Sequence, residues 1–228
     1  MIHPDTFKFL EELQENNHKP WFDENHDWYK AIRGKWVDLT EIILKKLAVD
    51  DNTLAEVDVK KCLFRINRDI RFSKDKSPYK TNFSMIFTPF GKKMMLAGYY
   101  VHLERNNCFL AGGIYQPEMT TIKKIRREIN AFPEEWISIM QEPLFKKNYN
   151  DLDVEPGLKT KKIPPGFEAE HLAAEYLKFK SFTASMPMPD QDFFRDDIAD
   201  LIASELLLLK PMISYLNRGI MDNEDTLS

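Results

Sequence analysis

The 228-residue chain has few cysteines and no long hydrophobic run, and both absences exclude common classes of protein. Cys62 and Cys108 are its only cysteines and form no C-x-x-C pair, which excludes a disulfide-stapled scaffold and a cysteine-rich zinc cluster. Because both lie in apolar runs, we expect buried, reduced thiols. No segment has the apolar length that a transmembrane helix needs, and the N-terminus lacks the basic and apolar regions of a signal peptide. The sequence therefore predicts a cytoplasmic protein without a membrane partner.

The signatures of common nucleotide-binding and hydrolytic sites are missing as well. Neither the G-x-x-x-x-G-K-S/T of a P-loop nor the G-x-G-x-x-G of a dinucleotide fold is present, and no G-x-S-x-G nucleophile turn occurs. His102 and Glu104 lie two residues apart, but no H-x-x-x-H or C-x-x-C motif supplies the further ligands of a metal site. We therefore expect no metal ion and no cofactor. The net charge of −4 also argues against a general nucleic-acid-binding protein, which usually has a basic domain.

The order of the periodic segments predicts an α+β fold, with helices before and after a central, mostly antiparallel sheet. The expected helices cover residues 5–15, 22–47, 117–129, 133–140, 168–179 and 190–219. The expected strands cover residues 62–69, 82–88, 95–104, 108–115 and 181–186. Pro211 is expected to kink or restart the last helix, and Gly219 to end it. We expect a single domain over residues 1–220 and a disordered acidic tail over 221–228.

Two short motifs within the expected sheet predict local backbone geometry. Asn106-Asn107 fits a two-residue hairpin loop, because asparagine tolerates the positive φ that such turns need. The adjacent glycines Gly112-Gly113 indicate a bulge or a close approach of the backbone to another group. That group is either a ligand or the ring of Tyr99 or Tyr100.

Positive charge is concentrated between residues 60 and 80, in a chain that is acidic elsewhere. This segment has eight lysines and arginines against Asp69 and Asp75, a local net charge of +6. In the expected strand 62–69, strict alternation places Arg68 on the apolar face, where an unpaired arginine is costly. Either a bulge rotates Arg68 outward, or a carboxylate such as Asp69 pairs with it, or it lines the floor of a pocket.

We expect this segment to bind an anionic small molecule that carries a phosphate or carboxylate group. The six cations expected to hold the anion are Arg65, Arg68, Arg71, Lys74, Lys76 and Lys80. Four side chains are candidate acid–base groups if the site is catalytic: Asp69, Tyr79, His102 and Glu104. Such a site would suit a hydrolase, a transferase or a non-catalytic sensor.

Two other interpretations of the segment remain open. It is an interaction module if its cations dock on an acidic protein or a nucleic-acid backbone, with Phe72 and Tyr79 offering rings for stacking. It is purely structural if Arg65, Arg68, Asp69, Arg71 and Asp75 form an internal ion-pair network. The structural interpretation differs from the small-molecule one in whether the guanidinium groups are paired with protein carboxylates or left open to solvent. Nucleic-acid binding would instead be recognised by its steep weakening as salt rises. No feature of the sequence sets an oligomeric state.

Residues 64–80 match the pattern Phe-Arg-Ile-x-Arg-Asp-x-Arg-Phe-Ser-x-Asp-Lys-x-Pro-Tyr-Lys. Further matching segments are Asn17-x-x-x-Trp21-Phe22, residues 98–104, residues 109–115, and residues 159–167 with His171 beyond them. Over roughly residues 4–220 the chain thus resembles a conserved hypothetical family, domain of unknown function twenty-four sixty-one. The resemblance implies one full-length α+β domain. It brings no reaction, substrate or cofactor with it.

Overall fold

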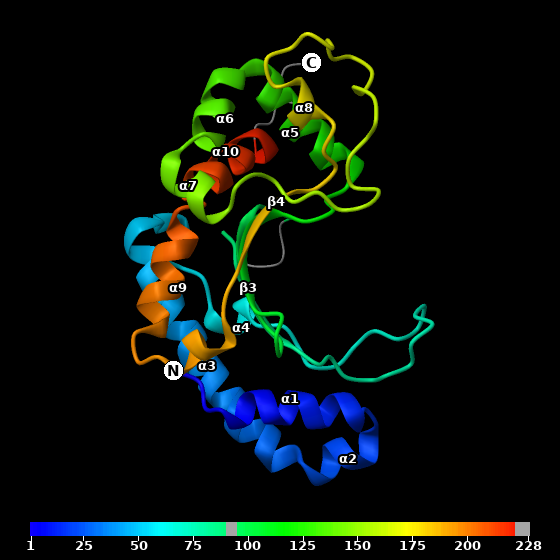
Figure 1. Cartoon of the computed structure of the whole chain (residues 1–228), viewed down its shortest axis with the longest axis vertical. Coiled ribbons are helices and arrows are strands. Elements are labelled where there is room, and N and C mark those ends of the chain that lie inside the picture. Colours follow the sequence, from blue (N-terminus) through cyan, green and yellow to red (C-terminus); the bar gives the residue numbers. More distant parts are fainter. Residues whose placement is uncertain (90–94, 222–228) are drawn as a thin grey trace. The chain divides into compact units, whose positions relative to one another are not determined.

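The computed structural model describes residues 1–89 and 95–221, and its secondary structure confirms the α+β fold (Figure 1). Within these residues, four strands form an antiparallel sheet in the order β1-β2-β3-β4. The strands are β1 (Phe83–Phe87), β2 (Gly98–Leu103), β3 (Phe109–Ile114) and β4 (Phe182–Pro187). Each corresponds to an expected strand, so the period-two patterns located the sheet correctly.

The described residues divide into two compact units. Unit 1 is drawn from Met1–Lys92, Tyr100–Leu110 and Pro187–Glu205, and unit 2 from Lys93–Tyr99, Ala111–Met186 and Leu206–Ser228. The single domain over residues 1–220 stays a prediction. Of the expected tail, Met221 ends the last helix and residues 222–228 lie outside the described part of the chain.

Helices form the first half of unit 1. They are α1 (Asp5–Glu15), α2 (Lys19–Glu24), α3 (His26–Asp50), the short 3₁₀ helix η1 (Asn52–Leu54) and α4 (Val59–Cys62). The expected helix 22–47 is therefore split at Asn25, which lies between α2 and α3 and donates to the carbonyl of Trp21 through both its backbone N–H (3.0 Å) and its side chain (2.9 Å). Trp36 of α3 is fully buried and stacks on Phe83 of β1, with ring centroids 5.9 Å apart. This contact anchors the long helix on one face of the sheet.

The expected strand 62–69 is wrong. Asp58 accepts a hydrogen bond from the N–H of Lys60 (2.9 Å) and begins α4, so Cys62 ends a helix instead of starting a strand. The following residues form only isolated bridges, Leu63 to Met85 and Asn67 to Tyr79. The chain folds back on itself here and does not extend the main sheet.

The hairpin between β2 and β3 is confirmed, but its turn lies one residue earlier than expected. The N–H of Asn107 donates to the carbonyl of Glu104 (3.0 Å), so Arg105 and Asn106 are the central residues. Asn106 has φ of 59°, as its residue type suggested. Asn107 has no positive φ and uses its side chain to bind Glu104 (2.7 Å).

Unit 2 contains the helices α5 (Met119–Ala131), α6 (Pro133–Met140), α7 (Pro143–Asn148), α8 (Ala174–Leu177) and α10 (Lys210–Met221). The expected helix 190–219 is divided into the 3₁₀ helix η3 (Asp190–Phe194), α9 (Ile198–Leu207) and α10, and Pro211 stands in the first turn of α10. Gly219 does not end α10. It lies inside the helix, where a Cβ would be 2.7 Å from Cβ of Glu128, so the two helices approach closely at this residue.

The paired glycines of β3 make the close backbone approach that the sequence indicated, but to protein atoms and not to a ligand or a tyrosine ring. A Cβ on Gly112 would lie 2.7 Å from Cδ1 of Leu209. Gly113 has φ of +115°, and a Cβ there would lie 1.9 Å from the carbonyl oxygen of Phe182 in β4. Gly112-Gly113 therefore serves packing within unit 2.

The two cysteines are buried thiols, as expected. Burial raises the pKa of Cys108 to about 12, so this thiol is protonated and inert at neutral pH. In the part of the chain that the structure describes, no helix is both long and apolar enough to cross a bilayer.

Candidate functional site

The segment that the sequence singled out forms a protruding two-legged loop, which we call the basic arm (residues 64–80, teal in Figure 1). Its two legs pair near the sheet, where the N–H of Lys80 donates to the carbonyl of Ile66 (2.8 Å) and that of Arg68 to the carbonyl of Pro78 (2.9 Å). Pro78 has no N–H to donate, which limits the ladder to these few bonds. The side chain of Arg68 and the residues beyond it, 69–77, form the tip of the arm.

The N-terminal helices hold the arm at its base. The side chain of Asn17 binds both backbone groups of Tyr79, donating to its carbonyl (3.0 Å) and accepting from its N–H (3.0 Å). The Tyr79 ring is buried and stacks on Phe22, with centroids 4.1 Å apart and planes 15° from parallel. Burial raises the pKa of Tyr79. The structure thus gives Tyr79 an anchoring contact, and its acid–base role stays a prediction.

Most charges of the tip are paired with each other. Arg68 forms an ion pair with Asp75, and Arg71 binds Asp69 through two parallel bonds of 2.9 and 2.6 Å. Of the three outcomes open to Arg68, the structure shows pairing with a carboxylate, Asp75 and not Asp69. Lys76 donates to the carbonyl of Ile70 (3.0 Å). The structural interpretation therefore describes most of the tip.

The Asp75 carboxylate accepts hydrogen bonds from Ser77 as well as from Arg68. The backbone N–H of Ser77 (2.9 Å) and its hydroxyl (2.7 Å) both donate to the carboxylate, and with Arg68 they lower the pKa of Asp75 to about 2. The Arg71 side chain likewise lowers the pKa of Asp69. Both carboxylates are thus ionised, occupied acceptors at neutral pH, and neither is poised to take a proton.

The two cations at the base of the arm have no carboxylate partner. Among the described residues, no Asp or Glu lies within ion-pair distance of Arg65 or Lys80. The Lys80 ammonium lies over the Phe64 ring, 5.1 Å from its centroid, and Lys80 is half-buried. Burial, and then the positive charge of Arg65, lower the pKa of Lys80. Arg65 and Lys80 therefore repel one another, and the charge of Arg65 also contributes to lowering the pKa of Asp69.

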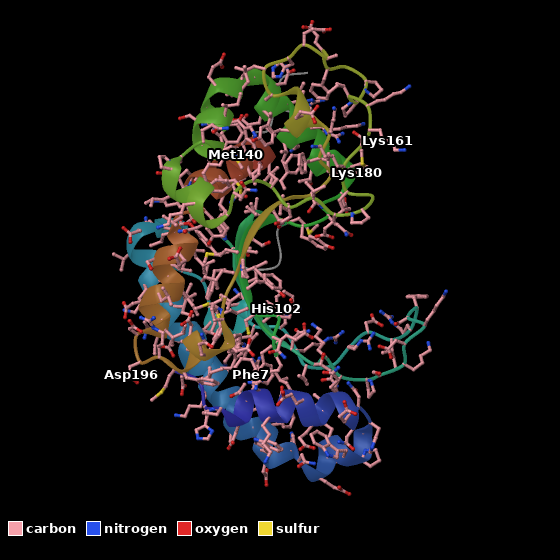
Figure 2. All side chains as sticks on the ribbon, viewed as in Figure 1. Phe7, His102, Met140, Lys161, Lys180 and Asp196 are labelled. Carbon is pink, nitrogen blue, oxygen red and sulfur yellow. The ribbon has the colours of Figure 1, made fainter. Side chains whose placement is uncertain are left out.

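Beside the base of the arm, one face of β2 presents a row of hydrogen-bonded side chains that includes His102 (Figure 2). Tyr100, His102 and Glu104 are two residues apart along an extended chain, so they share a face. Oη of Tyr100 is 3.0 Å from Nδ1 of His102, and Nε2 of His102 is 3.3 Å from Oε2 of Glu104. The expected pairing of His102 with Glu104 is present, and Tyr100 extends it.

The direction of each bond in this row follows from the charges. Burial would raise the pKa of Glu104, but bonds from Asn107 and His102 outweigh it and keep the carboxylate ionised. An ionised carboxylate only accepts, so Nε2 of His102 carries a proton. Burial lowers the pKa of His102, which leaves the ring neutral at pH 7 with Nδ1 accepting from the Tyr100 hydroxyl. Ser84 in turn donates to Oη of Tyr100.

Aromatic rings surround the row and connect it to the arm. Phe64 meets the Tyr100 ring edge-on at 6.2 Å, and Phe109 of β3 stacks on His102 at 4.6 Å. Thr81, which follows Lys80, donates to Oε1 of Glu104 (3.2 Å). The base cations and the row therefore adjoin. We call the set of Ser84, Tyr100, His102, Glu104, Phe64 and Phe109 the polar face.

Sequence reasoning missed Tyr100 and Ser84. Tyr100 had an available signal, since it precedes His102 by two residues in an expected strand and must share its face. Ser84 had none, because the register of β1 against β2 is not readable from either strand alone. Lys74, which was also expected to bind the anion, lies exposed at the tip, and its binding role stays a prediction.

Other parts of the described chain offer weaker sites. A surface pocket of about 350 Å³ lies between α3 and α9, but the ammonium of Lys46 at its rim is already paired with Asp200. None of the expected site residues lines this pocket. No three His, Cys, Asp or Glu side chains within residues 1–89 and 95–221 are arranged to hold a metal ion.

Comparison with known proteins places the chain in a family. The family described as "Conserved hypothetical protein (DUF2461)" matches residues 5–215. The chain belongs to this family. No curated protein and no solved structure matches the chain. The DUF2461 match spans both compact units and the whole of the candidate site, and the function of the family is not part of its description.

Proposed function

We propose that this DUF2461 protein binds a phosphorylated or carboxylated small molecule at the base of the basic arm. The observation that carries the proposal is the pair Arg65 and Lys80, which has no carboxylate within ion-pair distance among the described residues; Arg65 is exposed, whereas Lys80 is half-buried and has a lowered pKa. Holding a second cation near a half-buried ammonium is unfavourable, and a bound anion offsets that cost. The ionised Glu104 offsets at most one of the two charges, and it already accepts hydrogen bonds from Thr81, His102 and Asn107.

The proposal narrows the set of six cations expected from the sequence. Arg68, Arg71 and Lys76 already bind groups of the arm itself, so they shape the loop. An anion that recruited them would have to displace Asp75 or Asp69 first. Arg65 supplies a planar pair of donors, and Lys80 supplies a compact charge. These two residues are the primary anion ligands in the proposal.

The polar face supplies acid–base groups next to the bound anion. His102 is neutral with Nδ1 accepting, which is the form of a general base, and Glu104 fixes the ring in that tautomer. Burial raises the pKa of Tyr100, so its hydroxyl remains a proton donor at neutral pH. Proton transfer between Tyr100 and His102 fits a hydrolase or transferase acting on the bound molecule. Binding is the basic function in the proposal, and catalysis is its extension.

A thermal-shift and calorimetric screen with phosphate, sulfate, sugar phosphates and dicarboxylates tests the proposal. We expect at least one of these anions to raise the melting temperature of the wild type. Lys80→Met should lose that response, because it removes the charge and keeps the apolar stem. Lys74→Met, a matched change at the exposed tip, should keep it. Absence of stabilisation by every anion, or an equal response of Lys80→Met, would contradict the proposal.

The tip supports a second candidate function, an interaction module. Phe72 is 95% exposed, and the guanidinium of Arg71 lies 5.8 Å from its ring centroid. An exposed ring beside cations suits stacking on single-stranded nucleic acid. A gel shift with single-stranded RNA and DNA at low salt checks this candidate, and binding that weakens as salt rises and is lost in Phe72→Ser supports it. No shift at low salt excludes it.

A further inference from the structure

We infer that the anion bound at the base of the arm carries a planar aromatic ring, and that nucleoside monophosphates are the fitting class of ligand. This inference rests on the proposed function, because it requires an anion at Arg65 and Lys80. It adds a second recognition element, the aromatic part of the polar face. The observations concern how the rings and hydrogen-bonding atoms of that face are arranged around Lys80.

The ring of Phe64 lies directly beneath the ammonium of Lys80. Lys80 lies over the face of Phe64, so an anion on this ammonium rests at the rim of that ring. Phe64 meets Tyr100, and Tyr100 meets Phe109 at 5.7 Å with planes 37° apart. All three side chains are only partly buried. A ligand extending from the anion across the sheet therefore meets aromatic rings in succession.

One flat ring of the protein already stacks on Phe109. The imidazole of His102 lies against Phe109 with planes 16° from parallel. Aromatic pairs can also meet edge to face, and this pair does not. A planar base suits a row of rings better than a sugar or an aliphatic chain does, because every base has a π-face to stack. A ring-bearing ligand therefore gains contact that inorganic phosphate lacks.

Glu104 provides a hydrogen-bond acceptor for the same ligand. Oε2 of Glu104 receives Asn107 and His102, whereas Oε1 receives Thr81 among the described residues. An ionised carboxylate has about four acceptor positions, so Oε1 has capacity for one further donor. The side chain of Glu104 is 30% exposed, which makes that position reachable from solvent. Hydroxyl groups of a ribose, or N–H groups of a base, are donors of the required kind.

A graded series of ligands separates these contributions. Inorganic phosphate has only the charge, ribose 5-phosphate adds hydroxyl donors, phenyl phosphate adds only a ring, and nucleoside 5′-monophosphates have all three. We expect affinity, measured by isothermal titration calorimetry on the full chain, to rise along this series. A single base–ring stack should raise affinity about tenfold for the nucleotide relative to ribose 5-phosphate.

Two variants test whether the nucleobase contacts the ring of Phe109. Phe109→Leu keeps an apolar side chain and removes the ring, and we expect it to abolish the tenfold advantage of the nucleotide while phosphate affinity is unchanged. Phe72→Leu is the matched control at the tip and should leave both affinities as in the wild type. If Phe109→Leu does not fold, saturation-transfer NMR on the wild type replaces it. The expected transfer to the protons of the nucleobase is then stronger than to those of the ribose.

The outcomes distinguish this inference from the proposed function. If phosphate and ribose 5-phosphate bind and no nucleotide binds more tightly, the ring contact is refuted and anion binding stands. If none of the four ligand types binds, both fail. A nucleotide advantage that persists in Phe109→Leu and Phe64→Leu also overturns the inference, because the rings would then contribute nothing. A nucleotide advantage lost in these variants and kept in Phe72→Leu supports it.

Discussion

The tip and the base of the basic arm contain the same kinds of side chain but dispose of their charge in opposite ways. At the tip, Arg68 and Arg71 bind Asp75 and Asp69. At the base, Arg65 and Lys80 have no carboxylate within ion-pair distance among the described residues, and Lys80 is half-buried. The tip therefore pairs its two arginines with carboxylates and leaves the exposed Lys74 and Lys76 without one among the described residues, whereas the base holds a half-buried cation that no carboxylate pairs with.

This difference shows that local net charge does not locate a binding site. The segment 60–80 has a net charge of +6, but much of that charge is on groups already engaged within the arm. What distinguishes the base is pairing and burial, because an unpaired, partly desolvated cation is costly in the free protein. The ion pairs of the tip fit the structural interpretation, whereas anion binding is proposed only for the base.

The largest expected effect is on stability, at the polar face beside the base. His102→Ala leaves the hydroxyl of Tyr100 without its acceptor, removes one donor from Glu104 and takes a ring from Phe109. We expect the free energy of unfolding to fall by about 2–3 kcal/mol, the cost of a broken, partly buried hydrogen-bond chain. Asp75→Asn at the exposed tip should give no measurable change. Urea denaturation of both variants measures the contrast, and equal losses would erase the distinction between base and tip.

The next effect is on anion affinity. Arg65→Gln should weaken binding of the best anion several-fold, because a charge-assisted hydrogen bond is lost. Arg71→Gln should leave that affinity unchanged, because the Arg71 guanidinium is occupied by Asp69. Calorimetric titration of the two variants provides the comparison. A loss in Arg71→Gln as large as in Arg65→Gln would mean that the tip also contributes to the site.

A smaller effect is expected in the pH dependence of stability. The pKa of His102 is lowered from its ordinary value of 6.5 because of burial, so the unfolded chain takes up this proton before the folded protein does. The stabilisation is complete above pH 6.5 and is lost as the pH falls toward the folded pKa. Melting temperatures between pH 7.5 and 5 should therefore decline, and His102→Asn should reduce the slope. An unchanged slope in this variant would contradict a neutral, buried His102.

The smallest expected effect is on the pKa of Asp75 at the tip, and it does not involve the base of the arm. Asp75 should titrate near its pKa of about 2, below its ordinary value of 3.8, because Ser77 and Arg68 stabilise the carboxylate. Ser77→Ala should bring the titration back toward the ordinary value, as followed by carboxyl-carbon NMR. The anion response of this variant should equal that of the wild type. A titration at the ordinary value in the wild type would show that the tip is not organised in this way.

The sequence predicted the fold class and the strands well, because these depend on local periodicity. Phe83, Met85 and Phe87 alternate inward in β1 as their spacing indicates. The prediction of a strand over residues 62–69 was wrong because Asp58 begins the helix α4, and the alternating pattern of the following residues gave no sign of that helix. The turn at Asn106 was placed one residue late, because Asn106 and Asn107 are equivalent in propensity and differ only in which one binds Glu104.

The contacts within the candidate site could be predicted from the sequence only in part. His102 and Glu104 were paired correctly because two-residue spacing in a strand fixes their common face. The partners of the arm's cations could not be assigned, since Asp69 and Asp75 lie at similar sequence separations from several arginines. Only the fold of the loop determines that Arg68 meets Asp75 and that Lys80 meets no carboxylate within the described part of the chain. Long-range partners such as Asn17 for Tyr79 are likewise set by tertiary structure.

The most direct test of the account is the titration of the Lys80 side chain by heteronuclear NMR, without and with inorganic phosphate. The account predicts that Lys80 titrates below its ordinary value of 10.5 in anion-free buffer and shifts upward when phosphate neutralises its surroundings. The side-chain signals of Lys74 should not respond to phosphate. A Lys80 titration that is the same at every phosphate concentration would contradict the claim that an anion binds at the base of the arm.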